Sequence, residues 1–253
     1  MLRRLFFTAI LAGLITGLIT SALHQVTTVP IILKAESYEI ASAAKFSSSS
    51  SKAVAAAFLA PPASTIPSYH PVHGADDSQG QATTWVPKEG LERAFFSTLT
   101  NTLLAIGFAL LLVSGMIIRG ETVDVRRGLL WGAGGFVVFT LAPSLGLPPE
   151  IPGIATADLV PRQTWWISAA AAAVGGLWLL IFADGLVRKT IGVAIMVIPH
   201  LVGAPHPNEL GTVKIPAELA AQFASTSIVI SAVFWALLGG LSGYFHGRDE
   251  PAH

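Results

Sequence analysis

The sequence contains no cysteine and little charge. Without thiols, the chain forms no disulfide, no thiolate metal site and no cysteine nucleophile. Charged residues make up 12% of its 253 residues, about half of the roughly 25% that is typical of soluble domains. A water-exposed surface with so little charge would present apolar patches and aggregate, whereas a lipid-facing surface would not. The composition therefore predicts an integral membrane protein.

Further function classes are excluded by what the sequence lacks. Its 15 basic and 15 acidic residues give a net charge of zero, so no overall positive field favours nucleic acid. The chain has no G-x-x-x-x-G-K-[ST], H-E-x-x-H or G-x-S-x-G motif. An intramembrane enzyme would need a paired acid and base or a metal triad in its apolar segments. In the apolar segments of this chain, His200 is the only side chain that could serve in such a site. We expect neither a nucleic-acid partner nor enzymatic activity.

Long apolar segments account for most of the chain, whose mean hydropathy is +0.64. A helix needs about 20 mostly apolar residues to cross a bilayer. Candidate spans cover residues 5–23, 94–118, 128–147, 165–183, 187–203 and 226–244. The fifth contains Pro199 and reaches a spanning length only when it begins near residue 187. These segments predict a single all-α membrane domain, polytopic, with about six transmembrane helices.

The first span and the distribution of basic residues indicate the topology. Residues 5–23 are too long for a signal-peptide core of about 7–15 residues, and no A-x-A site follows, so we expect an uncleaved anchor. The two short loops on the opposite side contain only Arg162 and Lys214 as basic residues. Basic residues concentrate in cytoplasmic segments, which places both termini in the cytoplasm. The segments assigned to that side contain Arg3, Arg4, Arg119, Arg126, Arg127, Arg188, Lys189 and Arg248.

The long loop after the first span divides into two parts. Residues 30–45 are typical of a short amphipathic helix, with Pro30 in its first turn. Residues 46–84 are rich in Ser, Ala and Pro. We expect this insert to be disordered, because it buries too little apolar surface to offset the entropy of ordering.

Candidate metal ligands are limited to histidine, carboxylate, methionine and backbone oxygen, a set that suits Co, Ni or Zn. The segment IPHLVGAPHPNE, residues 198–209, is the most informative. Pro199 frees a backbone carbonyl in the fifth span, which is tolerated at depth only where protein or water satisfies it. His200 follows directly, and His206 and Glu209 lie just outside. The pattern predicts a metal or proton station, and the alternative is a neutral His200 bonded to a neighbouring helix.

Two other segments contain candidate ligands. In LAPSLGLPPEIPG, residues 141–153, Pro143 interrupts the third span and Glu150 is the only charge. Glu150 is either a cation ligand at the mouth or a solvated loop acid. Glu36 and Glu39 share one face of the predicted outer helix at i,i+3, and His24 at the end of the first span adds a nitrogen. The alternative for this group is an ordinary polar helix face.

Two weaker signals complete the set. His70 and His73 in the insert form a short histidine tract of the kind that captures metal weakly. Small-xxx-small pairs permit close helix contact but identify no partner helix. Such pairs include Gly13/Gly17, Gly128/Gly132 and Gly239/Gly243.

The order of several motifs resembles the CbtA family of predicted cobalt transporter subunits. The similarity runs from MLRRLFFTAILAGLITGLI through HQVTTVPIILKAESYE, WVPKEGLERAFFSTLTNTLLAIGFALLL and RRGLLWGAGGFVVFTLAPSLGLPPEIPG to RQTWWI and IPHLVGAPHP. LAPSLGLPPEIPG and IPHLVGAPHP are its most specific parts. The chain departs from the family at Lys34, where an acidic residue is expected, which weakens the prediction of a site at Glu36 and Glu39.

The resemblance implies about six spans and a role in cobalt uptake for cobalamin synthesis, with a small one-span partner, CbtB. We therefore expect inward transport of Co²⁺ across a bacterial inner membrane, with Ni²⁺ as the nearest alternative ion and no tightly bound cofactor. The alternative function is a non-transporting subunit that stabilises a permease. Besides membrane lipid and CbtB, a second copy of the chain is a candidate partner.

Overall fold

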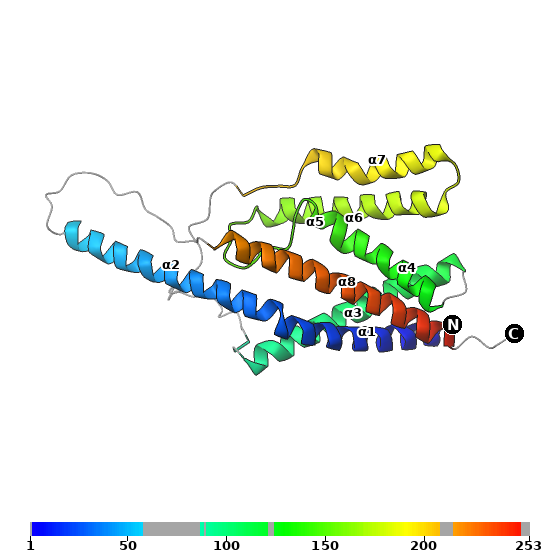
Figure 1. Cartoon of the computed structure of the whole chain (residues 1–253), viewed down its shortest axis with the longest axis horizontal. Coiled ribbons are helices and arrows are strands. Elements are labelled where there is room, and N and C mark those ends of the chain that lie inside the picture. The colour runs from blue at the N-terminus through cyan, green and yellow to red at the C-terminus, as the bar shows by residue number, and fades with distance from the viewer. Residues whose placement is uncertain (1, 58–86, 89, 121–123, 208–214, 249–253) are drawn as a thin grey trace, which may run out of the picture.

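The computed structural model describes residues 2–57, 87–88, 90–120, 124–207 and 215–248, and these residues contain helices and no strand (Figure 1). The all-α class is therefore confirmed. The helices are α1 (Leu2–Val26), α2 (Thr28–Ala57), α3 (Leu91–Arg119), α4 (Val125–Phe136), the π-helical η1 (Val137–Leu141), α5 (Ala142–Ser144), α6 (Leu159–Phe182), α7 (Leu186–Val202) and α8 (Ala217–Arg248).

Among the described residues, four helices are long and apolar enough to cross a membrane: α1 from Arg3 onward, α3, α6 and α8. They correspond to the first, second, fourth and sixth predicted spans. The third falls on the helical run from α4 through η1 to α5, and the fifth on α7, which has 17 residues. These two helical segments stay predicted spans.

Proline affects the two segments in different ways. Before Pro143 the helix widens into η1, where the N–H of Ala142 bonds to the carbonyl of Val137 with π-helical spacing. Helical structure then ends at Ser144. α7, in contrast, stays helical through Pro199 and ends at Val202, before Gly203 with φ +87°. Such a backbone angle favours glycine. The described fold thus interrupts the α-helix near Pro143 more strongly than at Pro199.

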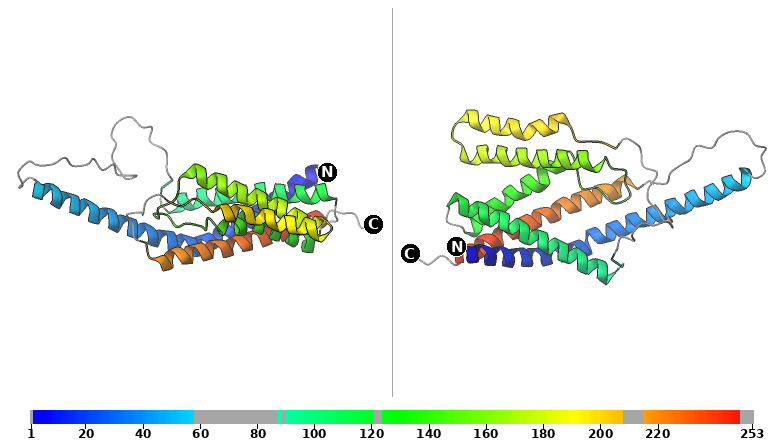
Figure 2. Two further views of the ribbon diagram at one scale, coloured as in Figure 1. Left: turned by 90° about the horizontal axis from the view of Figure 1, so that it is seen from above. Right: turned by 180° about the vertical axis from the view of Figure 1, so that it is seen from behind.

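α2 begins one residue after α1 and is longer than the helix predicted for residues 30–45. It continues to Ala57, through the first part of the predicted disordered insert. Alanine is the strongest helix former, and the last turns of α2 are rich in it. Residues 58–84 of the insert lie outside the described residues. α2 projects past the other helices at the end opposite the termini (Figures 1 and 2).

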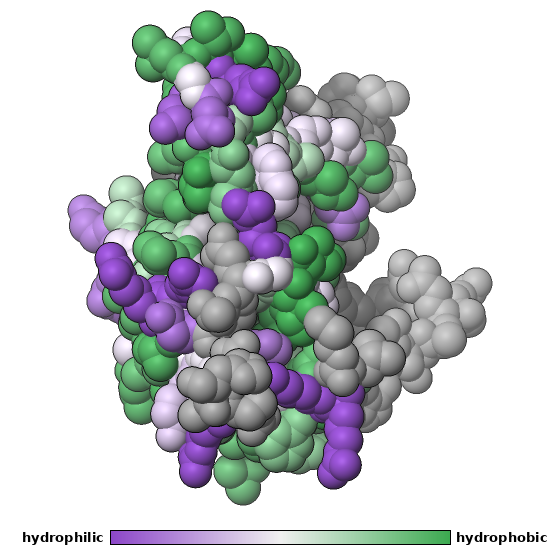
Figure 3. All heavy atoms as spheres, turned by 90° about the vertical axis from the view of Figure 1, so that its right-hand side faces the viewer, coloured by the Kyte–Doolittle hydropathy of each residue, from purple (hydrophilic) through white to green (hydrophobic). Residues whose placement is uncertain are grey.

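The start of α1 and the end of α8 lie at the same end of the bundle (Figures 1 and 2). The Arg4 guanidinium at the start of α1 donates a hydrogen bond to the backbone carbonyl of His246 near the end of α8. Hydrophilic side chains gather on this end, and hydrophobic ones lie around it (Figure 3). The side of the membrane that this end faces stays a prediction.

Glycines allow three helix pairs to pack closely. These pairs are α1 with α3, α4 with α8, and α6 with α7. At the central positions of each contact, an added Cβ atom would overlap backbone atoms of the partner helix. The positions are Gly13 and Gly17 in the first pair, Gly128, Gly132 and Gly239 in the second, and Gly176 and Gly192 in the third. The three small-xxx-small pairs named from the sequence therefore lie at helix contacts, and two of them face each other.

Candidate functional site

Three of the candidate ligands, Glu36, Glu39 and Glu150, lie at the end of the bundle opposite the termini, in a region we call the outer cap after its predicted side of the membrane. It comprises the first half of α2, the loop 145–158 and the start of α8. Ile31, Ala35, Ile151 and Leu219 form its buried apolar cluster, and Ile151 is only 2% exposed. α2 is therefore docked on the proline-rich loop through buried side chains. This docking positions Glu36, Glu39 and Glu150 at one end of the molecule.

Both Glu36 and Glu150 are already ion-paired. The Glu150 Oε2 atom lies 2.6 Å from Nη2 of Arg162, at the start of α6. The Glu36 Oε1 atom lies 2.8 Å from Nη2 of Arg93, at the start of α3. A divalent cation must compete with an arginine at each carboxylate. In the sequence, Arg162 is the only basic residue of its short loop. This is the one signal that could have identified Arg162 as the partner of Glu150.

Glu39 has a different neighbour from Glu36. Its carboxylate lies where a Cβ atom of residue 153 would be, and the glycine found there has φ +87°. The backbone angle favours glycine at this position, and the Glu39 side chain fills the space beside it. The i,i+3 spacing places the two acids on one helix face, but Glu36 contacts α3 whereas Glu39 contacts the proline-rich loop.

His200 connects α7 to α5. Its Nδ1 atom lies 3.0 Å from the Met196 carbonyl oxygen, one turn earlier in α7. Its Nε2 atom lies 3.0 Å from the carbonyl oxygen of Ala142. The ring also meets Trp165 of α6 edge to face, with centroids 5.7 Å apart at 85°. His200 is thus held between three helical segments.

Both oxygens beside the His200 ring are carbonyls, which accept hydrogen bonds and cannot donate them. A neutral imidazole has one N–H group, so it bonds to only one of the two oxygens. The doubly protonated ring donates to both. A metal ion needs an unprotonated nitrogen with its lone pair directed at the metal. Metal binding by His200 therefore requires the ring to turn away from at least one carbonyl.

Trp165 binds the backbone at the proline in α7. Its indole Nε1–H donates to the carbonyl oxygen of Pro199 at 3.1 Å, and this bond is buried. The N–H of Gly203 reaches the same oxygen at 3.1 Å. Two donors thus satisfy a carbonyl near the end of α7. Sequence reasoning missed this role, because the spacing of 34 residues between Trp165 and Pro199 carries no local signal.

The other predicted ligands are dispersed. His24 Nδ1 lies 2.8 Å from Thr28 Oγ1 at the junction of α1 and α2, and His206 is exposed after α7. Glu209, His70 and His73 lie outside the described residues. Within the part of the chain that the structure describes, no three His, Asp or Glu side chains form a group that could hold a metal ion.

Comparison with known proteins identifies one family. The model of the family described as probable cobalt transporter subunit (CbtA) matches residues 2–247, nearly the whole chain. The match includes the outer cap, His200 and all the helices described above. Searches of curated proteins and of solved structures found no match.

Proposed function

The chain belongs to the CbtA family of probable cobalt transporter subunits, and from this premise we propose that it is a membrane subunit of a divalent-metal uptake system. Its proposed substrate is Co²⁺ taken up for cobalamin synthesis, with Ni²⁺ as the nearest rival ion. The family match over residues 2–247 carries this proposal.

The proposed topology has six spans in a bacterial inner membrane, with both termini in the cytoplasm. The four long apolar helices support it, as does the shared end of α1 and α8. The helices that begin or end there contain the basic residues predicted to be cytoplasmic. An excess of Lys and Arg in short loops is typical of the cytoplasmic side.

The proposed route for the ion begins at the outer cap. Glu150, His206 and Glu209 collect the hydrated cation, and Glu150 must release Arg162 to do so. His200 then accepts the ion by turning away from the carbonyl of Ala142. Imidazole nitrogen and carboxylate oxygen suit Co²⁺. Because coordination needs unprotonated histidine, uptake should fall at acid pH.

Uptake of radiolabelled cobalt by cells tests the role of His200. His200→Ala removes both the nitrogen ligand and the bridge to Ala142. His200→Gln is the matched variant, because its amide can bond to the Ala142 carbonyl but offers no imidazole nitrogen. If His200 is a ligand, both variants lose uptake at equal membrane abundance. Normal uptake by either variant would contradict a ligand role for the imidazole.

A second function is favoured by how the candidate ligands are engaged. Glu36, Glu150 and His200 are all occupied by groups of the protein itself. This observation fits a subunit that stabilises a separate permease and moves no ion. A small CbtB-like one-span subunit or a second copy of this chain is then the proposed partner. Cobalt flux into liposomes that contain only this purified chain would rule out that function, and flux only after a partner is added would support it.

A further inference from the structure

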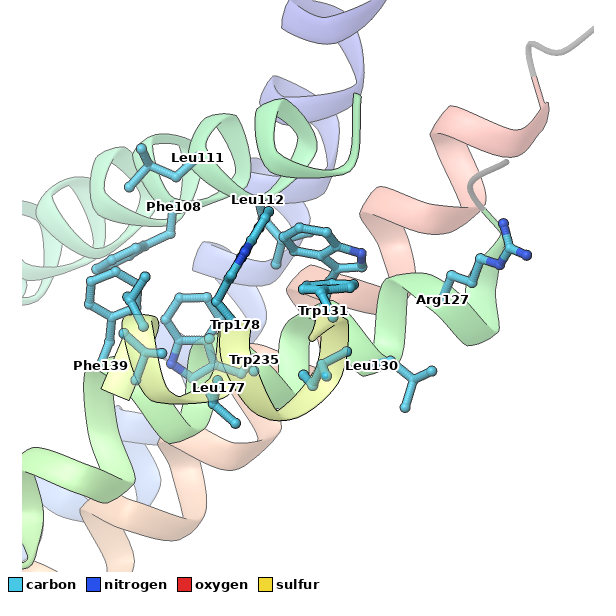
Figure 4. A pocket seen from close by; sticks show the side chains of 16 residues that line it. Phe108, Leu111, Leu112, Arg127, Leu130, Trp131, Phe139, Leu177, Trp178 and Trp235 are labelled. Carbon is cyan, nitrogen blue, oxygen red and sulfur yellow. The ribbon is translucent and has the colours of Figure 1, made fainter. Parts of the chain in front are cut away.

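An apolar groove opens between α3, α4 and α6 in the half of the bundle nearer the termini. Its volume is about 410 Å³. Aromatic and aliphatic side chains line it, among them Phe108, Leu112, Trp131, Phe139, Leu177 and Trp178 (Figure 4). Trp178 is 50% exposed and Leu111, on the opposite wall, is 63% exposed, so the groove opens to the surroundings of the bundle. In a membrane those surroundings are hydrocarbon.

The position of the groove follows from how α6 is attached. Towards the outer end, α6 packs on η1 and α5 through the buried residues Val138, Ala142, Ala170 and Ala173. Towards the inner end, α4 presents Gly134, and an added Cβ atom there would meet no atom within 4 Å. Glycine therefore leaves space where a larger side chain would fill the groove. The space lies between α6 and α3 in the inner half of both helices, and Arg119 of α3 meets Phe182 of α6 at its inner end.

Two arginines stand at the inner end of the groove. Arg127, in the first turn of α4, lines it directly. The Arg119 guanidinium lies 4.1 Å from the ring centroid of Phe182, which also lines the groove. Figure 4 shows Arg127 at one end of the row of side chains and Phe108 and Phe139 at the other. Asp124 offsets part of this charge, with its Oδ1 atom bonded to the backbone N–H of Arg127 at 2.7 Å.

The dimensions and charges of the groove distinguish among its conceivable occupants. The lining residues of α6 run from Val174 to Phe182, which at 1.5 Å per residue is about 12 Å of helix. A spanning helix is about 30 Å long, so only a short part of one could lie in the groove. An acyl chain is narrow enough to enter it, and a phosphate at its end would meet the two arginines.

We infer that the groove binds one anionic phospholipid of the phosphatidylglycerol class. The acyl chain lies among Phe108, Trp131 and Trp178, and the phosphate group lies at Arg127 and Arg119. The lipid fills the space between α3 and α6 and braces the α6–α7 hairpin against the rest of the bundle. This inference concerns a different site from the proposed ion route and does not depend on it.

Native mass spectrometry of the purified full-length protein tests the inference. The delipidated protein is titrated with phosphatidylglycerol and, separately, with phosphatidylcholine of the same chain length. The expected result is one tightly bound phosphatidylglycerol per chain and weaker binding of phosphatidylcholine. Replacing both arginines in Arg119→Gln/Arg127→Gln should reduce the preference by about fivefold per arginine, because each basic side chain near an anionic lipid contributes about 1 kcal/mol. Equal affinity for the two lipids in the unmodified protein, or an unchanged preference in the double variant, would overturn the inference.

A variant that fills the groove separates this site from general lipid contact. Gly134→Leu places a side chain in the groove, and Gly175→Leu on α6 is its matched control, because an added Cβ atom at Gly175 also meets no atom within 4 Å. Only Gly134→Leu should lose the tightly bound lipid. Retention of that lipid by Gly134→Leu at the level of Gly175→Leu would contradict the proposed site. Melting curves establish that both variants are folded, and the arginine variants test the site even if Gly134→Leu is not.

Discussion

The helix contacts inside the bundle combine a buried cluster of side chains, among them Met116, Trp235 and Leu238, with close backbone contacts at glycines, whereas the described contacts of the outer cap are made by side chains. Inside the bundle, backbone meets backbone where glycines face a partner helix, as between Gly128 of α4 and Gly239 of α8. In the outer cap, side chains make the contacts, through an apolar cluster centred on Ile151 and the pair of Glu150 with Arg162.

The difference is explained by the solvent that we propose for each region, which is lipid around the bundle and water at the outer cap. Lipid is as apolar as a leucine side chain, so burying leucine between two membrane helices gains little. Helices in a membrane associate through close packing of small residues. In a region that contacts water, burying apolar surface is itself favourable. Ion pairs can also form there, because partly exposed charges keep some of their hydration and pairing costs them little. The predictions below test this contrast, from the largest expected effect to the smallest.

Gly239→Leu should have the largest effect on stability. A side chain at this position overlaps the backbone of α4 at Gly128, so the two helices must separate along their length. We expect a loss of at least about 3 kcal/mol, the upper end of the usual cost of overpacking. Thermal melting in detergent and the yield of monodisperse protein measure it. Gly107→Leu in α3 is the control, because an added Cβ atom there meets nothing within 4 Å. Equal melting temperatures would refute the backbone contact.

Ile151→Ala should weaken the outer cap and leave the bundle folded. Truncating a buried isoleucine costs about 2–5 kcal/mol, and Ile151 is 2% exposed between α2 and α8. The loss should appear as faster hydrogen exchange in the first half of α2. Leu145→Ala, at a residue that is 72% exposed, serves as the control. Unchanged exchange in α2 would show that the apolar cluster does not hold this helix.

Trp165→Phe tests a contact at the boundary between the two regions. The substitution keeps an aromatic ring beside His200 but removes the donor to the Pro199 carbonyl. An unsatisfied buried acceptor costs about 1–3 kcal/mol; here the cost should be near the lower figure, because Gly203 still donates to the same oxygen. Trp166→Phe, one residue along α6, is the control. The melting temperature should fall further for Trp165→Phe, and the reverse order would refute the assigned hydrogen bond.

Arg162→Gln should have the smallest effect on stability. The side chains of Arg162 and Glu150 are 31% and 26% exposed, and such ion pairs contribute about 0–1 kcal/mol and less at high salt. The substitution frees Glu150, so cobalt should bind more tightly if this carboxylate is a ligand. Calorimetry with CoCl₂ on Arg162→Gln, with and without Glu150→Gln, measures the effect. Unchanged affinity in Arg162→Gln would remove Glu150 from the proposed route.

Much of the helical framework could be predicted from the sequence, because local composition decides it. Backbone groups in lipid must be satisfied within the segment, so a long apolar run has to be helical. The helices that contain residues 5–23 and 94–118 follow from this rule. The end of α2 was not predictable in the same way, since the Ser- and Ala-rich residues after Lys45 carry no apolar pattern that indicates where a helix stops.

The candidate site depended on contacts that sequence could not supply. The segment around Pro199 directed attention to His200, but the ring is bonded to Ala142, 58 residues away. Glu150 was recognised as the single charge of residues 141–153, while its partner Arg162 lies 12 residues further along the chain, at the start of α6. Each such pairing is set by how helices are placed in space, and no local pattern encodes it.

The sequence by itself determined the membrane class, the family and the positions of most helices. Apolar length, charge distribution and motif order can all be read along the chain without knowing how it folds. Only the tertiary structure decided which glycines face one another, which arginine holds each outer carboxylate and what surrounds His200. Those features depend on residues distant in the chain, and they become neighbours only once the helices have packed.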